Sequence, residues 1–329
     1  MLRRPTFLQI DPPSRSALAE EADAGLRAPQ AWLSPKLFYD PLGSRLFDAI
    51  TELPEYYPTR TEAALMARHG ADMAAAVRSA LPEPLTLVDL GAGNCTKAAA
   101  LFDLLEPAHY VAVDISADYL RNTLTCLQRE YPDLRMSGVG MDFSARLALP
   151  AEVLADERTG AAPQGALLFY PGSSIGNFDP PEALRLLREA RALAGGAALL
   201  IGVDLIKPLD VLLPAYDDTL GVTAAFNLNV LRRLNALLGA DFHLADWQHE
   251  ARFNTAASRI EMHLRARTEL TVRWQGGERR FAPAETIHTE NSYKWTTESF
   301  SALLTEAGFA QQKHWTDERG WFAVFMATG

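Results

Sequence analysis

The sequence LVDLGAGNCTK, residues 87–97, decides the fold of this chain. Residues 85–90 form an apolar run that is typical of a strand buried in a parallel sheet. Gly91 and Gly93 follow directly, and glycine allows a tight turn where a ligand approaches the backbone. We expect a helix over 96–105, whose first N–H groups face that ligand. Strand, turn and helix predict the first unit of a nucleotide-binding α/β sheet, although such a turn can also hold no ligand.

The identity of the nucleotide depends on two further features. A dinucleotide fingerprint would have a third glycine near position 96, where the chain has Thr96 and Lys97. The next predicted strand, residues 109–114, ends at Asp114, about where a carboxylate that binds ribose hydroxyls is expected. This combination favours S-adenosylmethionine over a nicotinamide dinucleotide as the cofactor.

Strands and helices alternate regularly as far as residue 203. Further strands are predicted to end at Met141, Tyr170 and Val203, with helices over 117–131 and from Asp179 between them. This alternation predicts a parallel sheet with right-handed crossovers, whose ligands gather at the carboxyl ends of the strands. The residues expected at that edge are Gly91, Asp114, Asp142, Phe143 and Asn177.

Asp142 and Phe143 suit an adenine ring. The carboxylate can accept a hydrogen bond from the adenine amino group, and the aromatic ring offers a π face. The alternative interpretation places Asp142 in a turn and Phe143 in the core.

The flanking segments follow other patterns. Residues 1–60 predict a helix over 17–28 and an aromatic-rich stretch rather than the start of a Rossmann sheet, and Thr59 and Glu62 have capping-box spacing, which predicts a helix from Arg60. After a helical segment over 208–240, strands are predicted over 259–265, 269–274 and 280–287, with a hairpin turn at 276–277. A helix over 299–307 and strands over 311–316 and 321–326 complete the chain. We therefore predict a cofactor domain, residues 61–206 and 297–329, and a substrate-binding domain, residues 1–60 and 207–296.

Composition excludes several classes of function. The 329 residues carry a formal charge of −10, which disfavours a nucleic-acid partner because such binding depends on clustered lysine and arginine. Cys95 and Cys126 lack metal-site spacing, and so do the histidines, of which His263 and His288 are expected to be ordinary strand residues. No signal peptide is recognisable, and the longest apolar run, 197–203, is too short to span a bilayer. We predict a cytoplasmic monomer without metal, membrane or nucleic acid.

Motifs spread over nearly the whole chain carry a family resemblance. They are LPEYYPTRTEA at 53–63, DLGAGNCTK at 89–97, MDF at 141–143, GSSIGNF at 172–178, AYDD at 215–218, VTAAFNLNVL at 222–231, RIEMHLRA at 259–266 and TENSYKW at 289–295. With these motifs the chain resembles the histidine-specific α-N-methyltransferases of ergothioneine biosynthesis. That family converts L-histidine to its Nα-trimethyl betaine, hercynine.

The resemblance implies a fold and a set of site residues. The fold is a Rossmann-like S-adenosylmethionine methyltransferase sheet with a terminal antiparallel hairpin, joined to a second α+β substrate domain. Cofactor contacts are implied at Gly91, Gly93, Lys97, Asp114, Asp142 and Phe143. Histidine contacts are implied at Tyr56, Asn177, Tyr216, Glu290 and Ser292, with Tyr39, Phe47 and Met262 lining the pocket and Tyr39 and Asn177 in catalytic roles.

Methyl transfer to an amine needs a lone pair aligned with the sulfonium methyl group, so positioning dominates the chemistry. An α-amine has a pKa of about 8 and needs no strong base. The aromatic faces of Tyr39, Phe47 and Tyr56 can stabilise the developing ammonium, or these residues simply pack in the core. Asn177 and Tyr216 offer donors to the substrate carboxylate, although Asn177 could instead cap a loop.

Glu290 and Ser292 are alternate residues of an extended segment, so they point to one side and can both meet an imidazole; the alternative is a solvated strand. The chain departs from the expected pattern at Asn291, where an apolar residue would stand, and at Tyr293, in the stretch that contacts the side chain. Two alternatives therefore stay open: an N-methyltransferase for a different free amino acid, or a non-catalytic protein that senses S-adenosylmethionine.

Overall fold

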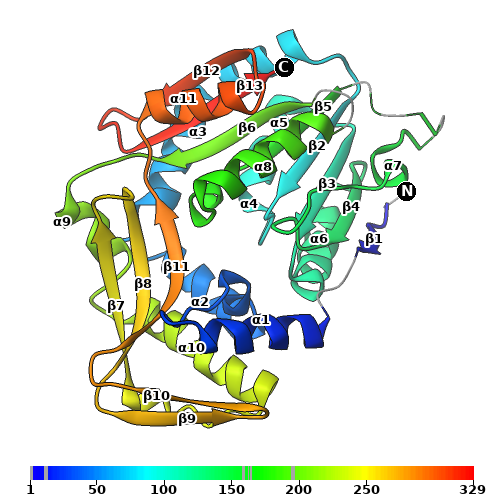
Figure 1. Ribbon diagram of the computed structural model, residues 1–329. Helices are drawn as coiled ribbons and strands as arrows, with labels where there is room; N and C mark the ends of the chain where they lie inside the picture. The colour runs from blue at the N-terminus through cyan, green and yellow to red at the C-terminus, as the bar shows by residue number, and fades with distance from the viewer. Residues whose placement is uncertain (1–2, 11–13, 158–159, 162, 164, 194–196) are drawn as a thin grey trace. The chain divides into compact units, whose positions relative to one another are not determined.

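The computed structural model describes residues 3–10, 14–157, 160–161, 163, 165–193 and 197–329 (Figure 1). The chain divides into two compact units. Unit 1 consists of Met1–Pro12, Pro58–Ile206 and Trp295–Gly329, and unit 2 of Pro13–Tyr57 and Lys207–Lys294. No helix of the described residues is both long and apolar enough to cross a membrane.

Unit 1 is built on an eight-stranded sheet of order β1-β4-β3-β2-β5-β6-β13-β12. All neighbouring strands are parallel except β13, which is antiparallel to both β6 and β12. The predicted α/β class and the terminal antiparallel hairpin are thus confirmed. The strands are β1 (Thr6–Gln9), β2 (Leu85–Leu90), β3 (His109–Asp114), β4 (Arg135–Gly140), β5 (Gly165–Tyr170), β6 (Ala198–Asp204), β12 (Gln311–Thr316) and β13 (Phe322–Thr328).

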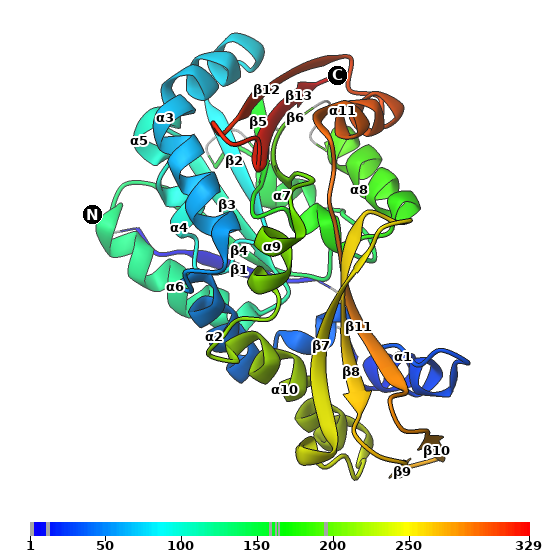
Figure 2. The same cartoon turned by 90° about the vertical axis from the view of Figure 1, so that its left-hand side faces the viewer.

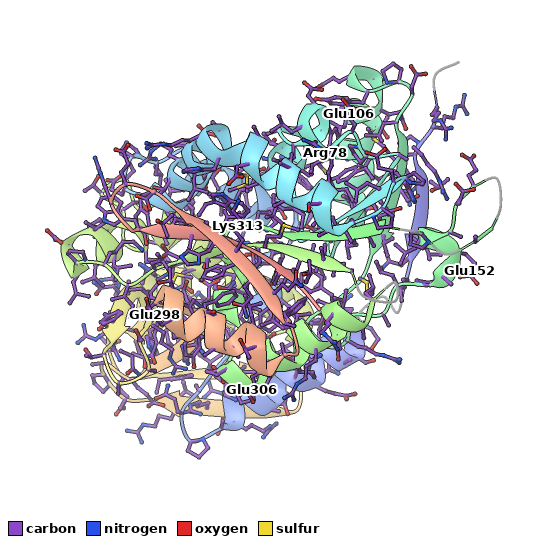
Figure 3. All side chains as sticks on the ribbon, turned by 90° about the horizontal axis from the view of Figure 1, so that it is seen from above. Arg78, Glu106, Glu152, Glu298, Glu306 and Lys313 are labelled. Atoms are coloured by element: carbon purple, nitrogen blue, oxygen red, sulfur yellow. The ribbon has the colours of Figure 1, made fainter. Side chains whose placement is uncertain are left out.

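Helices cover both faces of this sheet, which explains why β2, β5 and β6 are buried at every residue. In Figure 2, α3 and α6 lie on one side of the strands and α8 and α11 on the other. In Figure 3, Glu298 and Glu306 mark α11, Arg78 marks α3, and Lys313 of β12 lies between them. The helices are α3 (Tyr57–Ala80), α4 (Thr96–Ala99), α5 (Phe102–Leu105), α6 (Ala117–Glu130), α7 (Ala151–Leu154), α8 (Pro180–Ala192) and α11 (Thr297–Glu306).

Alternate residues of each central strand belong to different cores. Val88 of β2 packs in the core under α8 and α11, whereas Leu87 packs in the core under α3 and α6. This two-sided burial fixes the register of the strands and hence the edge at which their carboxyl ends meet.

Three details of unit 1 differ from the sequence predictions. β1 pairs in parallel with β4 at the sheet's edge, so the N-terminal segment does contribute a strand. The single helix expected over 96–105 is two short helices, α4 and α5, separated at Ala100 and Leu101, where the Leu101 N–H bonds to the Ala98 carbonyl three residues back at 2.9 Å. The capping box expected at Thr59 and Glu62 is wrong, because α3 already begins at Tyr57.

Unit 2 combines helices with two small antiparallel sheets, of order β11-β8-β7 and β10-β9. The strands are β7 (Trp247–Asn254), β8 (Arg259–Ala266), β9 (Leu270–Trp274), β10 (Gly277–Phe281) and β11 (Thr286–Tyr293). The helices are α1 (Arg15–Arg27), α2 (Pro41–Thr51), α9 (Leu209–Leu212) and α10 (Val222–Leu238), with 3₁₀ turns η1 (Pro35–Phe38) and η4 (Leu213–Ala215).

The β segments of unit 2 correct the sequence predictions in two places. β7 was not expected. The strand predicted over 280–287 is two strands from different sheets, β10 and β11, because Ala284 adopts a left-handed conformation with φ of 67° and breaks the extended run. The predicted turn between β9 and β10 is confirmed, with Gly276 at a φ of 94°.

Candidate functional site

Backbone torsion angles and backbone hydrogen bonds fix the shape of the glycine turn after β2. Gly91 and Gly93 have φ of 70° and 50°, a region that favours glycine. The N–H groups of Gly91 and Ala92 both donate to the Val113 carbonyl of β3, at 2.8 and 3.0 Å. A Cβ on Gly91 would come no closer than 3.9 Å to its nearest neighbour, Phe143. Conformation rather than crowding therefore demands glycine here, and space remains beside the turn.

Asp114, the last residue of β3, ties this turn to its own loop. Its Oδ2 accepts a hydrogen bond from Gly93 N at 2.9 Å, and its Oδ1 accepts one from Ser116 N at 2.8 Å. Burial raises the pKa of Asp114, while the backbone donors at Ser116 and Gly93 oppose that rise. The structure thus brings two of the predicted cofactor contacts, Gly93 and Asp114, into direct contact.

Asp142 lies in a turn and Phe143 packs partly in the core, as the alternative interpretation expected, and the adenine contact stays a prediction. Asp142 Oδ1 accepts from Ser144 N at 3.0 Å, so the residue does organise its own turn. Phe143 is half-buried and packs edge-on against Tyr170 at 5.8 Å, yet its ring also lies beside Gly91. Phe143 is therefore placed at the glycine turn, as the sequence predicts.

Lys97 has a partner, Glu62, that no sequence motif pairs with it. Its Nζ lies 2.7 Å from Oε2 of Glu62, a side chain that is only 1% exposed. Glu62 Oε1 also accepts from Gly172 N at 2.8 Å, in the loop after β5. The capping-box spacing predicts Glu62 at a helix cap, whereas its position three and four residues before the buried Leu65 and Met66 is the signal that places it on the inward face of α3.

Asp89 is a buried carboxyl directly below the turn, in β2. Tyr110 donates its hydroxyl to Asp89 Oδ2 at 2.7 Å, and Oδ1 has no hydrogen-bond partner among the described residues. Burial raises the pKa of Asp89 to about 7, against the lowering effect of the Tyr110 hydrogen bond. Asp89 therefore holds its proton more readily than an exposed aspartate, and a cation brought close to it would favour its charged form.

Asn177 ends a short 3₁₀ helix, η2 (Ser174–Asn177), after β5. The loop before it is fixed at Ser173, whose φ is 58° and whose Oγ accepts from Asp204 N at 2.8 Å. Asn177 belongs to unit 1, whereas the other implied histidine contacts belong to unit 2.

In unit 2, the predicted aromatic residues gather around Phe226 of α10, which the sequence analysis did not single out. Ring centroids of Tyr39 and Phe47 lie 6.1 and 6.0 Å from that of Phe226, and Phe47 lies 6.3 Å from Tyr56. Phe38 and Phe226 stack at 4.5 Å and are buried, whereas Tyr39, Phe47 and Tyr56 are only half-buried. The cluster therefore has a packed base and three partly exposed rings.

Asp40 fixes the helix that carries Phe47. Its Oδ1 accepts from Gly43 N at 2.7 Å and so caps the N-terminus of α2. The same oxygen accepts from Asn229 Nδ2 of α10 at 2.9 Å. One carboxylate thus starts α2 and fastens it to the helix that supplies Phe226.

A second part of the predicted histidine site lies at the end of β11. The hydroxyl oxygens of Tyr216 and Ser292 are 2.7 Å apart, although 76 residues separate them in sequence. Lys294, which the sequence analysis did not select, donates from Nζ to both, at 2.7 and 2.8 Å. Tyr216, Ser292 and Lys294 form a buried polar triad, with 9%, 6% and 3% of their surfaces exposed.

A β-bulge sets which face of the sheet Glu290 occupies. His288 lies opposite His263 of β8, but Glu290 lies opposite Met262, so Thr289 is an extra residue. Successive residues of β8 point to opposite faces, and the bulge therefore places Glu290 with Met262 and Ser292, away from His288. The predicted neighbours Met262, Glu290 and Ser292 do share a face.

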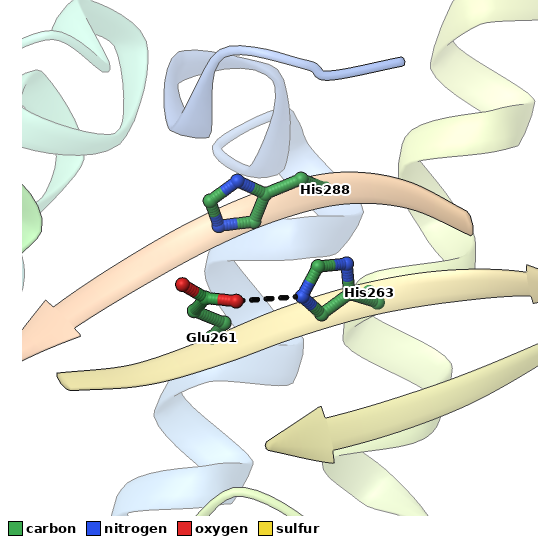
Figure 4. A group of neighbouring side chains, drawn as sticks. All are labelled: Glu261, His263 and His288. Atoms are coloured by element: carbon green, nitrogen blue, oxygen red, sulfur yellow. Dashed lines mark hydrogen bonds and ion pairs between the residues drawn. The ribbon is translucent and has the colours of Figure 1, made fainter. Parts of the chain in front are cut away.

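The opposite face carries Glu261, His263 and His288, drawn in Figure 4. Both histidines are strand residues, as predicted. Glu261 Oε2 lies 3.1 Å from His263 Nε2, and the two imidazoles stack at 4.8 Å. The potential ligand atoms spread over up to 4.8 Å, wider than the roughly 4.2 Å that two ligands about 2.1 Å from a zinc ion can span. Glu261 also pairs with Arg259 at 2.7 Å, and we interpret the group as a polar cluster that supports the strands.

Comparison with known proteins gives matches that span both units. Residues 18–329 match the family model described as "Histidine-specific methyltransferase, SAM-dependent". The chain is 41% identical over 320 residues to histidine N-alpha-methyltransferase of Mycolicibacterium smegmatis and 39% identical over 327 residues to that of Mycobacterium tuberculosis, covering 94% of both chains in each case. It is 30% identical over 287 residues to ergothioneine biosynthesis protein 1 of Schizosaccharomyces pombe, covering 84% of this chain and 36% of that protein.

Proposed function

Because the chain belongs to the histidine-specific, S-adenosylmethionine-dependent methyltransferase family, we propose that it methylates the α-amine of L-histidine, in three rounds that give hercynine. The observation that carries the proposal is the Tyr216–Ser292 hydrogen bond, because both residues are implied histidine contacts from distant parts of the sequence. Tyr216 is suited to the substrate carboxylate, and Ser292 with Glu290 to the imidazole.

The residues around the glycine turn of unit 1 fit S-adenosylmethionine. Gly91 leaves open space beside the turn, Asp114 offers a carboxylate for ribose hydroxyls, and Phe143 offers a ring face for the adenine. The orphaned Asp89 oxygen suits a cationic ligand. When bound, the cofactor supplies an electrophilic methyl group on a sulfonium sulfur.

The protein contributes to the chemistry by positioning the amine and by placing aromatic rings around it. The substrate amine is an ammonium at neutral pH and reaches its neutral form by losing a proton to solvent. The half-buried rings of Tyr39, Phe47 and Tyr56 can favour the ammonium that forms, by about 0.5 to 2 kcal/mol per ring. Asn177, like Tyr216, is proposed to donate to the carboxylate.

The sequence departures at Asn291 and Tyr293 do not weigh against histidine. Asn291 lies opposite Glu261 and Tyr293 opposite Arg259, so both point to the face away from Glu290 and Ser292. Tyr293 is bound there by Arg259, which donates to its hydroxyl at 2.6 Å. The residues that differ are therefore not those proposed to contact the imidazole.

The two units suggest a division of roles. We propose that unit 1, with the glycine turn, holds the cofactor and that unit 2, with the aromatic cluster and the polar triad, carries all the proposed amino-acid contacts except Asn177. A cytoplasmic location and a monomeric state remain our predictions. Sedimentation of the purified protein would check the monomeric state.

A substrate screen tests the proposed function. The protein is incubated with S-adenosylmethionine and each of the twenty amino acids, and products are identified by mass spectrometry. We expect histidine alone to gain three methyl groups. Equal turnover of phenylalanine or leucine would show that a different free amino acid is the substrate. Cofactor binding without any methylated product would favour the sensor.

A further inference from the structure

Glu62 is a buried carboxylate that contacts two separate parts of unit 1. Lys97 donates from Nζ to its Oε2 at 2.7 Å, and the Gly172 N–H donates to its Oε1 at 2.8 Å and to its Oε2 at 3.1 Å. Lys97 lies in α4, directly after the glycine turn, whereas Gly172 lies in the loop after β5. Because only 1% of the Glu62 surface is exposed, water cannot replace either donor.

Two glycines leave the space that this carboxylate and its lysine occupy. A Cβ on Gly202 of β6 would lie 2.1 Å from Glu62 Oε1, and a Cβ on Gly172 would lie 2.9 Å from Lys97 Nζ. Gly202 does not have a positive φ, so the side chains around it, rather than its backbone conformation, require glycine there. Two segments that are distant from Glu62 in sequence are therefore fitted to its ion pair.

The start of the loop after β5 determines where Asn177 lies. Gly172 and Ser173 have φ of 78° and 58°, and the Gly176 N–H donates to the Ser173 carbonyl at 2.8 Å within the turn that ends at Asn177. Glu62 of α3 binds this loop at Gly172, and the backbone of β6 binds it at Ser173 Oγ. Because the 3₁₀ turn follows these two residues directly, a shift of Gly172 would be passed on to Asn177.

We propose that Glu62 is a positioning residue for both ligands of the reaction. Its carboxylate fixes Lys97 for the cofactor, and it fixes the loop that ends at Asn177 for the amino acid. The proposal rests on the proposed function, because it takes Lys97 as a cofactor contact and Asn177 as a donor to the substrate carboxylate. The role of Glu62 requires no contact of its own with either ligand.

The two donors respond differently when Glu62 loses an oxygen. The Lys97 side chain is 34% exposed and can turn toward water, whereas the Gly172 N–H is part of the backbone and cannot turn away. In Glu62→Gln the amide oxygen therefore stays with Gly172, and the amide NH₂ faces Lys97. In Glu62→Met, which has an unbranched side chain of similar length, neither donor keeps an acceptor. The two variants thus separate the Lys97 contact from the Gly172 contact.

Calorimetric titration with S-adenosylmethionine and kinetics with L-histidine at saturating cofactor measure the two effects. We expect both variants to raise the Kd for S-adenosylmethionine by about 10-fold, the loss typical of a hydrogen bond to a charged group. Only Glu62→Met should also raise KM for histidine by about 10-fold, because Asn177 is then misplaced. Equal changes of KM in the two variants would indicate a purely structural role and would overturn the proposal, as would an unchanged Kd in both.

Asp72→Asn provides a matched control on the same helix. Asp72 also accepts from a lysine, Lys313, at 2.7 Å, but it is exposed. Its substitution should change neither constant, and losses equal to those of Glu62→Met would overturn the proposal. If Glu62→Met does not fold, Gly202→Ala displaces Glu62 Oε1 while keeping every charge. Gly202→Ala should raise KM for histidine in the same way, and an unchanged KM would overturn the proposal.

The failure of this inference can be told apart from that of the proposed function. If the unaltered protein transfers no methyl group to histidine, the function itself is wrong. If it does so and KM for histidine responds equally to Glu62→Gln and Glu62→Met, only the role of Glu62 is wrong.

Discussion

Replacing Glu62 with glutamine should destabilise the protein through its effect on Lys97. The substitution keeps the shape of the side chain and can keep an oxygen for Gly172 N, now 2.8 Å away. It then places an NH₂ group where Oε2 lies 2.7 Å from Lys97 Nζ. Two donors would face each other, and Lys97 would have to turn toward solvent.

The size of the effect follows from how deeply Glu62 and Lys97 are each buried. Glu62 is 1% exposed, so its carboxylate has no access to water, whereas the Lys97 side chain is 34% exposed and can recover part of its hydration. Breaking a fully buried ion pair costs about 3 to 5 kcal/mol, and a hydrogen bond to a charged group contributes about 1.5 to 3 kcal/mol. We therefore expect the free energy of unfolding to fall by about 2 kcal/mol. Lys97 is also a proposed cofactor contact, so S-adenosylmethionine should bind more weakly.

Urea unfolding and calorimetric titration with S-adenosylmethionine measure the two effects. Asp72→Asn is the control, because Asp72 lies on the same helix and also sits 2.7 Å from a lysine, Lys313, but both side chains are about half exposed. That exposed pair should contribute far less. A loss below about 0.5 kcal/mol in Glu62→Gln, or a loss equal to that of the control, would refute the reasoning, since breaking a buried charged contact should cost several times more.

Three further predictions address other parts of the molecule. Burial lowers the pKa of His263 to about 4, so the unfolded chain binds a proton that the folded chain rejects between pH 4 and 6.5. Stability should therefore rise with pH across this window, and His263→Gln should flatten the slope by up to about 1.4 kcal/mol per pH unit in urea titrations. Asp114→Asn puts a donor against Gly93 N or Ser116 N, so calorimetry should show at least about tenfold weaker cofactor binding; an unchanged Kd would contradict this. Phe226→Ala should cost about 3 to 5 kcal/mol and raise KM for histidine, whereas Phe226→Leu should cost much less; equal losses would argue against a packed aromatic base.

The central sheet could be predicted because its strands carry their own signal. β2, β5 and β6 are buried on both faces and appear in the sequence as mostly apolar runs. β1 lacks that signal, because it is an edge strand with mostly exposed residues. β7 alternates buried Trp247 and His249 with polar neighbours, and a histidine in the core obscures the apolar pattern.

The site was predictable where a motif is local and not where it depends on distant partners. Gly91, Gly93 and Asp114 follow consecutive strands, so the chain order already brings them together. Glu62 and Lys294 are charged residues whose burial makes sense only with partners 110 and 78 residues away. No periodicity within either segment identifies such a partner.

The extra residue Thr289 divides β11 into two parts, whose side chains are directed to different faces of the sheet. Before it, the alternation directs His288 toward the imidazole stack; after it, the same alternation directs Glu290 and Ser292 toward the other face. If Thr289 paired with Met262 in a regular ladder instead of forming a bulge, Glu290 and Ser292 would turn to the face of Glu261, and Asn291 and Tyr293 to the face of Met262. The side chains that this face presents therefore depend on the bulge as much as on the composition of the strand.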